Sequence, residues 1–277
     1  MIENTPENAP DKMPEILLYQ IVYSQKTLEN ISSGYLPLDN LDGARNDWRE
    51  YWPIRKFLLS QALSDDCYYG FFSPRFQEKV GLNHAQVLDF IRASPSGTDL
   101  ITFSPQPDMG AFFLNVFEQN DVFDNGFLSA SEAFLSAVGV PMSLKSLVMD
   151  SRQIIFSNYF VARPAFWRVW LNLNEKLFAI CEGEDSAVKQ LLVHATNYTG
   201  AVQRKVFLME RIASLLLTLN PAWKVHSYNT FACAWSASKL GSNKQDAVIS
   251  DALKIAMREQ GFPQYLSAFA AIRDKLR

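Results

Sequence analysis

Two short, almost continuous apolar runs constrain the fold of this chain more than any other feature. The segments ILLYQIVY (16–23) and CYYGFF (67–72) each have the length of a strand, without the alternation of a half-exposed one. Such runs are typical of strands that are covered on both faces of a mainly parallel sheet. Further strands are predicted at 98–103, 153–162 and 223–228.

Helix-forming segments lie between these strand candidates. Asn83 and Gln86 have the spacing of a capping box, which predicts a helix over 83–93. Pro164 suits the first turn of a helix that continues through "AFWRVWLNLNEKLFAI", and an amphipathic helix is predicted at 203–220. Because strands alternate with helices through most of the chain, we expect an α/β fold with helices flanking the sheet.

Single residues predict several other boundaries. Residues 35–47 carry Pro, Gly, Asn and Asp and are predicted to form a loop. Pro53 indicates either a kinked helix or a helix that begins near it. Asp108 and Ser129 are each predicted to be the N-cap of a later helix, and the tail is predicted to form two helices broken at 261–263.

The chain divides into three parts by composition. Residues 1–14 are polar and Pro-rich and are predicted to be a disordered leader, 15–240 the α/β domain, and 241–277 a helical extension. No window approaches the roughly 18 consecutive apolar residues of a membrane span. With three widely separated cysteines, we expect a cytoplasmic protein without a transmembrane segment, and contact with the inner membrane surface stays open.

Most chemical signatures are missing from the sequence. The net charge of −3, without a basic stripe, argues against nucleic acid as a partner. His84, His194 and His226 have no metal-ligand spacing, and no glycine-rich phosphate loop or G-x-S-x-G elbow is present. There is also no D-x-D pair of the kind that holds a metal in many nucleotide-sugar enzymes.

The run at 67–72 ends in Ser73-Pro74-Arg75, which raises the question of a ligand site. In open α/β sheets, ligands lie beyond the carboxyl ends of the strands. That rule places Ser73, Arg75, Ser104 and Asp108 near the edge of a site. The structural alternative is that the strand simply ends in a turn.

The early loop offers a second group of polar residues. Asp39, Asn40 and Asp42 are suited to hydrogen-bonding a sugar or a base. The same residue types also cap their own loop through Asx turns, and this structural alternative is the one that we favour from the residues alone.

Several segments taken together resemble a known group of proteins. They are residues 21–59, 68–82 and 99–119, followed by the stretches at 157–178 and 203–217. Their order resembles mostly unassigned bacterial proteins of surface-polysaccharide loci, and more remotely the GT-A-like galactofuranosyltransferase domains of O-antigen and capsule synthesis. The resemblance implies a GT-A-like mixed sheet flanked by helices.

The resemblance also assigns residues to a donor site. Its loop, helix and strand-end positions correspond to Asp39, Asn40, Asp42, Asn46, Glu50, Gly70, Ser73, Arg75 and Phe76. Its later positions correspond to Asn158, Glu210 and Arg211. The relatives carry a histidine and paired basic residues at the strand-end motif, where this chain has Ser73 and a single Arg75.

The function implied is transfer of a sugar from a nucleotide sugar to a lipid-linked or oligosaccharide acceptor. Arg75 then suits the diphosphate as a bidentate partner, with Lys79 as a second cation. Asp108 and Glu50 are the candidate catalytic carboxylates. No metal ligand is fixed, so Mn²⁺ or Mg²⁺ stays an open expectation, and other glycan-assembly enzymes are expected partners.

Each of these residues also has a structural alternative. Lys79 is solvated in that alternative, Asn158 pairs within a strand, Asp108 only caps its helix, and Glu210 with Arg211 pairs neighbouring helices. Two rival functions follow: a non-catalytic relative that docks a partner enzyme or a glycan, and a hydrolase with an unrecognised serine. Convergence of Asp39, Glu50, Ser73, Arg75 and Asn158 on one polar site would favour the enzyme.

Overall fold

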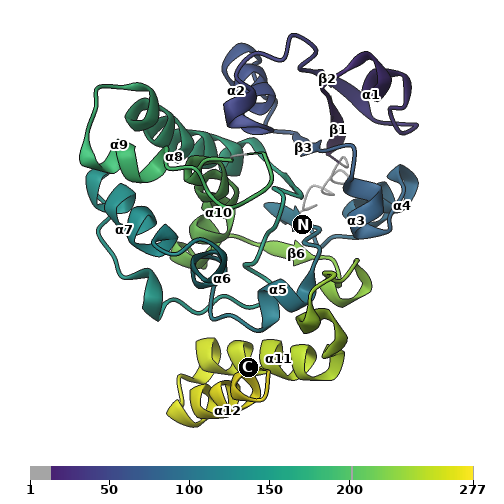
Figure 1. Ribbon diagram of the computed structural model, residues 1–277. Coiled ribbons are helices and arrows are strands. Elements are labelled where there is room, and N and C mark those ends of the chain that lie inside the picture. Colours follow the sequence, from purple (N-terminus) through teal and green to yellow (C-terminus); the bar gives the residue numbers. More distant parts are fainter. Residues whose placement is uncertain (1–13, 201, 277) are drawn as a thin grey trace, which may run out of the picture.

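One mixed sheet of six strands organises the computed structural model, which describes residues 14–200 and 202–276. The strand order is β2-β1-β3-β5-β4-β6. Strands β1, β2, β3 and β6 are labelled in Figure 1. The strands are β1 (Glu15–Val22), β2 (Leu36–Asp39), β3 (Cys67–Phe72), β4 (Leu100–Thr102), β5 (Phe160–Ala162) and β6 (Val225–Ser227). The predicted leader lies outside the described residues, apart from Pro14.

Strand direction determines which loops meet at each edge of the sheet. β1 pairs in parallel with both β2 and β3, and β4 pairs in parallel with β6. Only β5 runs against its neighbours β3 and β4. The carboxyl ends of the other five strands therefore share one edge with the amino end of β5, and we call this edge the carboxyl edge.

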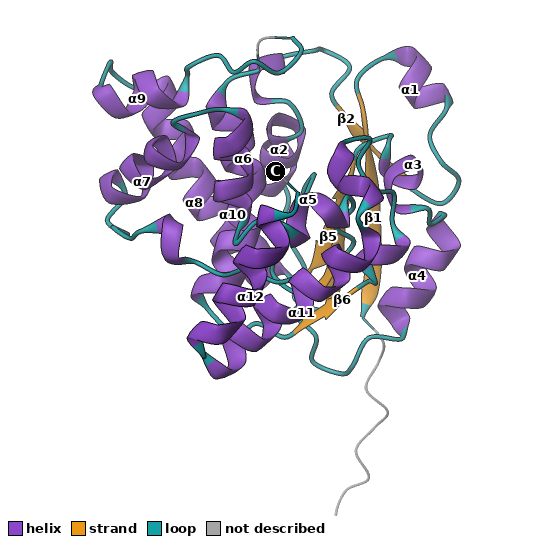
Figure 2. Ribbon diagram, turned by 60° about the horizontal axis from the view of Figure 1, so that its bottom comes forward, coloured by secondary structure: helices purple, strands orange, loops and turns teal. Residues whose placement is uncertain are grey.

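Helices cover both faces of the sheet (Figure 2). They are α1 (Gln25–Glu29), α2 (Tyr51–Ser60), α3 (Phe76–Val80), α4 (His84–Arg92), α5 (Pro107–Ala111), α6 (Val116–Phe123), α7 (Phe127–Ala137), α8 (Pro164–Glu182), α9 (Ala187–Leu192), α10 (Arg204–Leu219), α11 (Lys244–Gln260) and α12 (Pro263–Asp274). The larger core contains side chains of α8 and α10, and the smaller core contains side chains of α3 and α4. The expected α/β class, with a mixed sheet flanked by helices, is confirmed.

The central strand β3 shows why its sequence is apolar throughout. Tyr69 and Phe71 face the larger core, where the indole nitrogen of Trp167 in α8 donates to the carbonyl oxygen of Tyr69 at 3.0 Å. Tyr68 and Phe72 face the smaller core. Because both faces are buried, each side of this strand carries apolar or aromatic side chains and no charged one.

Two predicted boundaries of the sheet are wrong. The loop expected at 35–47 contains β2, which is short and forms an edge of the sheet. The strand expected at 153–162 forms only at its end, as β5. Ser157 and Asn158 have φ values of 59° and 52°, and this left-handed backbone interrupts the extended run.

The observed first residues of the helices agree with some of the predicted N-caps and differ from others. Asn83 caps α4 with the predicted capping box, and Pro53 lies in the first turn of α2. The predicted N-caps at Asp108 and Ser129 are wrong. Asp108 lies inside the first turn of α5, and α7 begins two residues before Ser129.

The C-terminal helices α11 and α12 pack together beside α5, as the predicted helical C-terminus requires (Figures 1 and 2). A small apolar core joins Phe112 and Phe113 to Ala247 and Ile272. The buried Lys254 donates to the carbonyl oxygens of Gly110 at 2.8 Å and Phe113 at 3.1 Å.

None of the helices in the described part of the chain is both long enough and apolar enough to span a membrane.

Candidate functional site

Polar side chains from separate parts of the chain meet at the carboxyl edge of the sheet. They follow β1 and β3, precede α2 and β5, and project from α3 and α10. We call them the carboxyl-edge cluster, and its members are Tyr23, Glu50, Ser73, Lys79, Ser157, Tyr159 and Glu210.

Hydroxyl groups form the inner part of this cluster. The Ser73 and Tyr159 hydroxyls share a hydrogen bond of 2.5 Å. Lys79 donates from Nζ to Ser157 Oγ at 3.0 Å, and its ammonium lies 5.6 Å from the centre of the Tyr159 ring. These contacts join the end of β3, helix α3 and the segment before β5.

Lys79 is half-buried, and burial lowers its pKa below the ordinary value for a lysine. The negative charges of Glu210 and Glu50 oppose this effect, while the charge of Arg75 adds to it. Among the residues that the structure describes, no carboxylate lies within 4.0 Å of the ammonium. Lys79 is therefore a partly desolvated cation without a close counter-ion.

Two carboxylates complete the cluster. Burial raises the pKa of Glu210, and the nearby Glu50 raises it further, although Arg211 and Lys79 act in the opposite direction. Glu50 accepts a hydrogen bond of 3.4 Å from the Tyr23 hydroxyl. A carboxyl group with a raised pKa is suited to exchange a proton near neutral pH.

The two polar residues of the strand-end motif, Ser73 and Arg75, point in different directions. Ser73 points inward to Tyr159, as described above. The Arg75 side chain is 64% exposed and is paired with Glu78 at 2.7 Å, one turn along the chain. Its charge still acts on Tyr159, so it lies near the rim of the cluster rather than among its hydroxyls.

In the early loop, Asp39 and Asp42 form hydrogen bonds with backbone groups of the same loop. Asp39 accepts from the backbone nitrogen of Leu41 at 2.9 Å, and Asp42 accepts from that of Ala44 at 3.0 Å. These are Asx turns, the structural alternative that the sequence also offered. Asn40 is buried and its Oδ1 has no hydrogen-bond partner in the described part of the chain. No hydrogen bond or ion pair joins these three residues to the cluster.

Asn158 and Arg211 lie behind the cluster, in the interior. Asn158 is not in a strand, so the strand pairing that was its structural alternative is wrong. Its Nδ2 lies 3.1 Å from the sulfur of Met209. Its Oδ1 is buried without a partner among the described residues. Arg211 donates to side chains of α6, Gln119 at 3.2 Å and Asn120 at 2.9 Å, and so connects two helices.

Asp108 forms no hydrogen bond with the side chains of the cluster among the described residues, although the segment that it holds passes Lys79, where Ala234 N donates to the Lys79 carbonyl oxygen at 2.9 Å. The Asp108 carboxylate is fully buried and accepts from the backbone nitrogen of Ser236 at 3.0 Å and from the hydroxyl of the same residue. Both oxygens therefore anchor the segment before α11. A buried carboxylate with two such donors is an anchor rather than a free proton acceptor.

Sequence reasoning missed Tyr23, Ser157 and Tyr159. Tyr23 ends the first apolar run and Tyr159 lies within the last one, where aromatic residues are expected in the core. The hydroxyl group of Tyr23, at the end of a predicted strand, was the available signal. The left-handed backbone that exposes Ser157 to Lys79 has no signal in the residue types.

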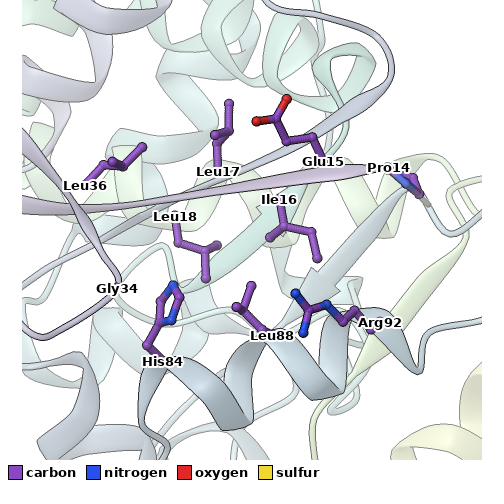
Figure 3. A pocket seen from close by; sticks show the side chains of 10 residues that line it. All are labelled: Pro14, Glu15, Ile16, Leu17, Leu18, Gly34, Leu36, His84, Leu88 and Arg92. Atoms are coloured by element: carbon purple, nitrogen blue, oxygen red, sulfur yellow. The ribbon is translucent and has the colours of Figure 1, made fainter. Parts of the chain in front are cut away.

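A cavity lies elsewhere, at the opposite edge of the sheet near the start of β1. It has a volume of about 490 Å³. Figure 3 shows Ile16, Leu18 and Leu88 projecting into it, while Glu15 projects from the other side of the strand. Arg92 and His84 supply the polar groups on the helix side, so the cavity is mainly aliphatic and separate from the cluster.

Within residues 14–200 and 202–276, no group of three or more His, Cys, Asp or Glu side chains is arranged to hold a metal ion. Comparisons of the chain with protein-family models, curated proteins and solved structures give no match.

Proposed function

We propose that this chain is a GT-A-like glycosyltransferase, which moves a sugar from a nucleotide-sugar donor to a bacterial surface glycan of O-antigen or capsule type. The observation that supports it is the carboxyl-edge cluster, where a cation without a close counter-ion is grouped with two carboxylates and four hydroxyls. The ends of parallel strands are where α/β enzymes bind their ligands. The resemblance at the strand-end and helix positions supports the same reaction.

For sugar transfer, a protein must accept a proton from the acceptor and stabilise the negative charge of the leaving diphosphate. A hydroxyl oxygen of the acceptor attacks the anomeric carbon, while the bond from that carbon to the diphosphate oxygen breaks. The proton of the hydroxyl passes to a base, and negative charge develops on the diphosphate. Glu210 or Glu50 is positioned to take the proton, and Lys79 with its hydroxyl neighbours to stabilise the charge.

Asp108 is not assigned a role in this reaction, because both of its oxygens are hydrogen-bonded to Ser236. Glu210 takes its place as the second candidate carboxylate beside Glu50. The acceptor in this proposal is lipid-linked or an oligosaccharide, and the protein works in the cytoplasm or at the inner membrane surface. Mn²⁺ or Mg²⁺ would accompany the donor if the reaction uses a metal.

Isothermal titration of the full chain tests donor binding. The panel contains UDP, GDP, dTDP and CDP and their common sugar conjugates, each with and without Mn²⁺. Binding of one nucleotide family is the expected result. Absence of binding for every member, in both conditions, would overturn the proposal.

Donor hydrolysis, measured as release of the nucleoside diphosphate, tests the chemistry. We expect Glu210→Gln or Glu50→Gln to slow it by about 100-fold or more, the usual contribution of a general base. The matched control is Glu15→Gln at the opposite edge of the sheet, which should change the rate less than twofold. Equal rates in all three variants would remove both carboxylates from the mechanism.

One observation favours a second function. Asp108 and Arg211, two of the expected site residues, are bonded inside the fold, as they would be in a non-catalytic relative. Such a protein would dock a glycan or a partner enzyme. Retention of the chain on an immobilised surface polysaccharide, together with no nucleotide binding, is the result that supports it.

A further inference from the structure

The Lys79 ammonium has more hydrogen-bonding capacity than the structure uses. A lysine carries three N–H donors, and the contact to Ser157 Oγ at 3.0 Å is the one hydrogen bond formed by this group among the described residues. The side chain is half-buried, so water replaces the missing partners only in part. A cation in such a position is stabilised by an anion that brings several acceptor oxygens.

The backbone next to Lys79 also has unused donors. Ser157 and Asn158 are consecutive residues with left-handed backbone, which costs on the order of 1–3 kcal/mol for each residue other than glycine. The neighbouring amides are used: Phe156 N donates to Ser104 Oγ at 3.1 Å, and Tyr159 N to the Phe156 carbonyl at 3.2 Å. In the described residues, neither Ser157 N nor Asn158 N donates to a protein group.

Consecutive backbone N–H groups in a turn form a concavity that binds anions. Here they lie in the same two-residue turn as the Ser157 hydroxyl that holds Lys79. Strained backbone of this kind is found at ligand sites, where the surrounding fold maintains it.

We propose that Lys79, together with the 157–158 turn, is the phosphate-binding part of the site and takes a phosphate group of the donor's diphosphate. This inference rests on the proposed function for the identity of the donor, but the phosphate chemistry stands apart from it. It assigns to Lys79 and Ser157 the role that the sequence assigned first to Arg75. Arg75 already has a partner in Glu78, on an exposed surface.

The probe for this site is inorganic pyrophosphate, titrated calorimetrically into the full chain in buffer with EDTA. Lys79→Met should weaken pyrophosphate binding by about 10-fold or more, because a hydrogen bond to a charged group is lost. Lys79→Arg should keep at least part of the affinity. Lys56→Met removes a partly exposed lysine that lies 3.6 Å from Asp42, and it is the matched control, expected within threefold of wild type. Arg75→Ala, at the rim of the cluster, should weaken binding less than Lys79→Met does.

Ser157→Ala is the second variant, chosen because it removes the hydroxyl and keeps the backbone. It should weaken binding about threefold or more if Ser157 orients Lys79. Circular dichroism of each variant establishes that it is folded. Unchanged affinity in folded Lys79→Met, or an equal loss in Arg75→Ala, would overturn the assignment.

The same titrations with nucleoside diphosphates separate this inference from the proposed function. Pyrophosphate binding that depends on Lys79, without binding of any nucleotide, supports the phosphate site and overturns the glycosyltransferase proposal. Nucleotide binding that is unchanged in Lys79→Met supports the glycosyltransferase proposal and overturns the phosphate site. No binding of either probe overturns both.

Discussion

Lys79 at the carboxyl edge and Lys254 beneath α5 are two lysines whose burial lowers their pKa, and their surroundings differ. Lys254 is fully buried, with two carbonyl oxygens at 2.8 and 3.1 Å and the charges of Asp251 and Asp150 nearby. Lys79 has one hydroxyl oxygen at 3.0 Å. The region around Lys254 supplies its own acceptors, whereas the region around Lys79 leaves donors free.

This difference separates a structural lysine from a candidate ligand-binding one. Burial is the largest cause of the lowered pKa in both, so the pKa direction does not distinguish them. The distinction comes from counting acceptors around each ammonium. Variants of the two regions should therefore affect different properties, stability in one and anion binding in the other.

The largest effect is expected for Lys254→Ala. This change leaves a cavity and two buried carbonyls without their donor, and we expect a loss of about 3–5 kcal/mol in the free energy of unfolding. Urea denaturation measures it. Lys275→Ala, an exposed lysine near the end of the chain, is the control and should stay within about 0.5 kcal/mol. A loss below about 1 kcal/mol for Lys254→Ala would show that its contacts are dispensable.

The pH dependence of stability is the next effect. Burial lowers the pKa of Lys254 to about 8, below its ordinary value of 10.5. Between these two values the unfolded chain binds more protons, so the free energy of unfolding should rise with pH over that interval. We expect a rise of about 2–3 kcal/mol relative to Lys254→Met, which removes the titrating group. Parallel pH profiles of the two proteins would contradict the lowered pKa.

Ser157→Gly probes the strained turn beside Lys79. Glycine adopts left-handed backbone readily, so we expect a gain of about 1 kcal/mol in the free energy of unfolding. Ser157→Ala keeps the strain and should show no gain. A loss of stability in Ser157→Gly would mean that the serine hydroxyl contributes more to the fold than its backbone costs.

The smallest effect is expected for Arg75→Ala. The pair with Glu78 is exposed on both sides, and such pairs contribute little to stability. The free energy of unfolding should change by less than about 0.5 kcal/mol, measured by the same urea titration. A larger loss would identify Arg75 as a structural residue. Its region would then contribute to stability, as the region around Lys254 does.

The fold was predictable where burial determines the sequence. β3, buried on both faces, begins and ends where its apolar run does, and the capping box of Asn83 fixes the start of α4. The prediction failed where long-range partners decide. Leu36–Asp39 reads as a loop and becomes a strand because β1 offers a free edge to pair with.

The candidate site was predictable only in part. Glu50, Ser73, Lys79 and Glu210 were all named from the sequence, and the structure brings them near one another. Their neighbours were not, because the contact between Lys79 and Ser157 joins residues far apart in the chain through an unusual backbone turn. Asp108 was assigned to a helix cap, and its actual partner, Ser236, lies in a segment that no local pattern connects to it.

The small apolar core between α5 and the last two helices has a practical consequence for preparing shorter forms of the protein. Phe112 and Phe113 are covered by Ala247 and Ile272. A fragment that stopped before α11 would present both aromatic rings to solvent and would leave the carbonyls that Lys254 satisfies open to water. Such a fragment would be prone to self-association, so affinity tags are better attached beyond α12 than substituted for it.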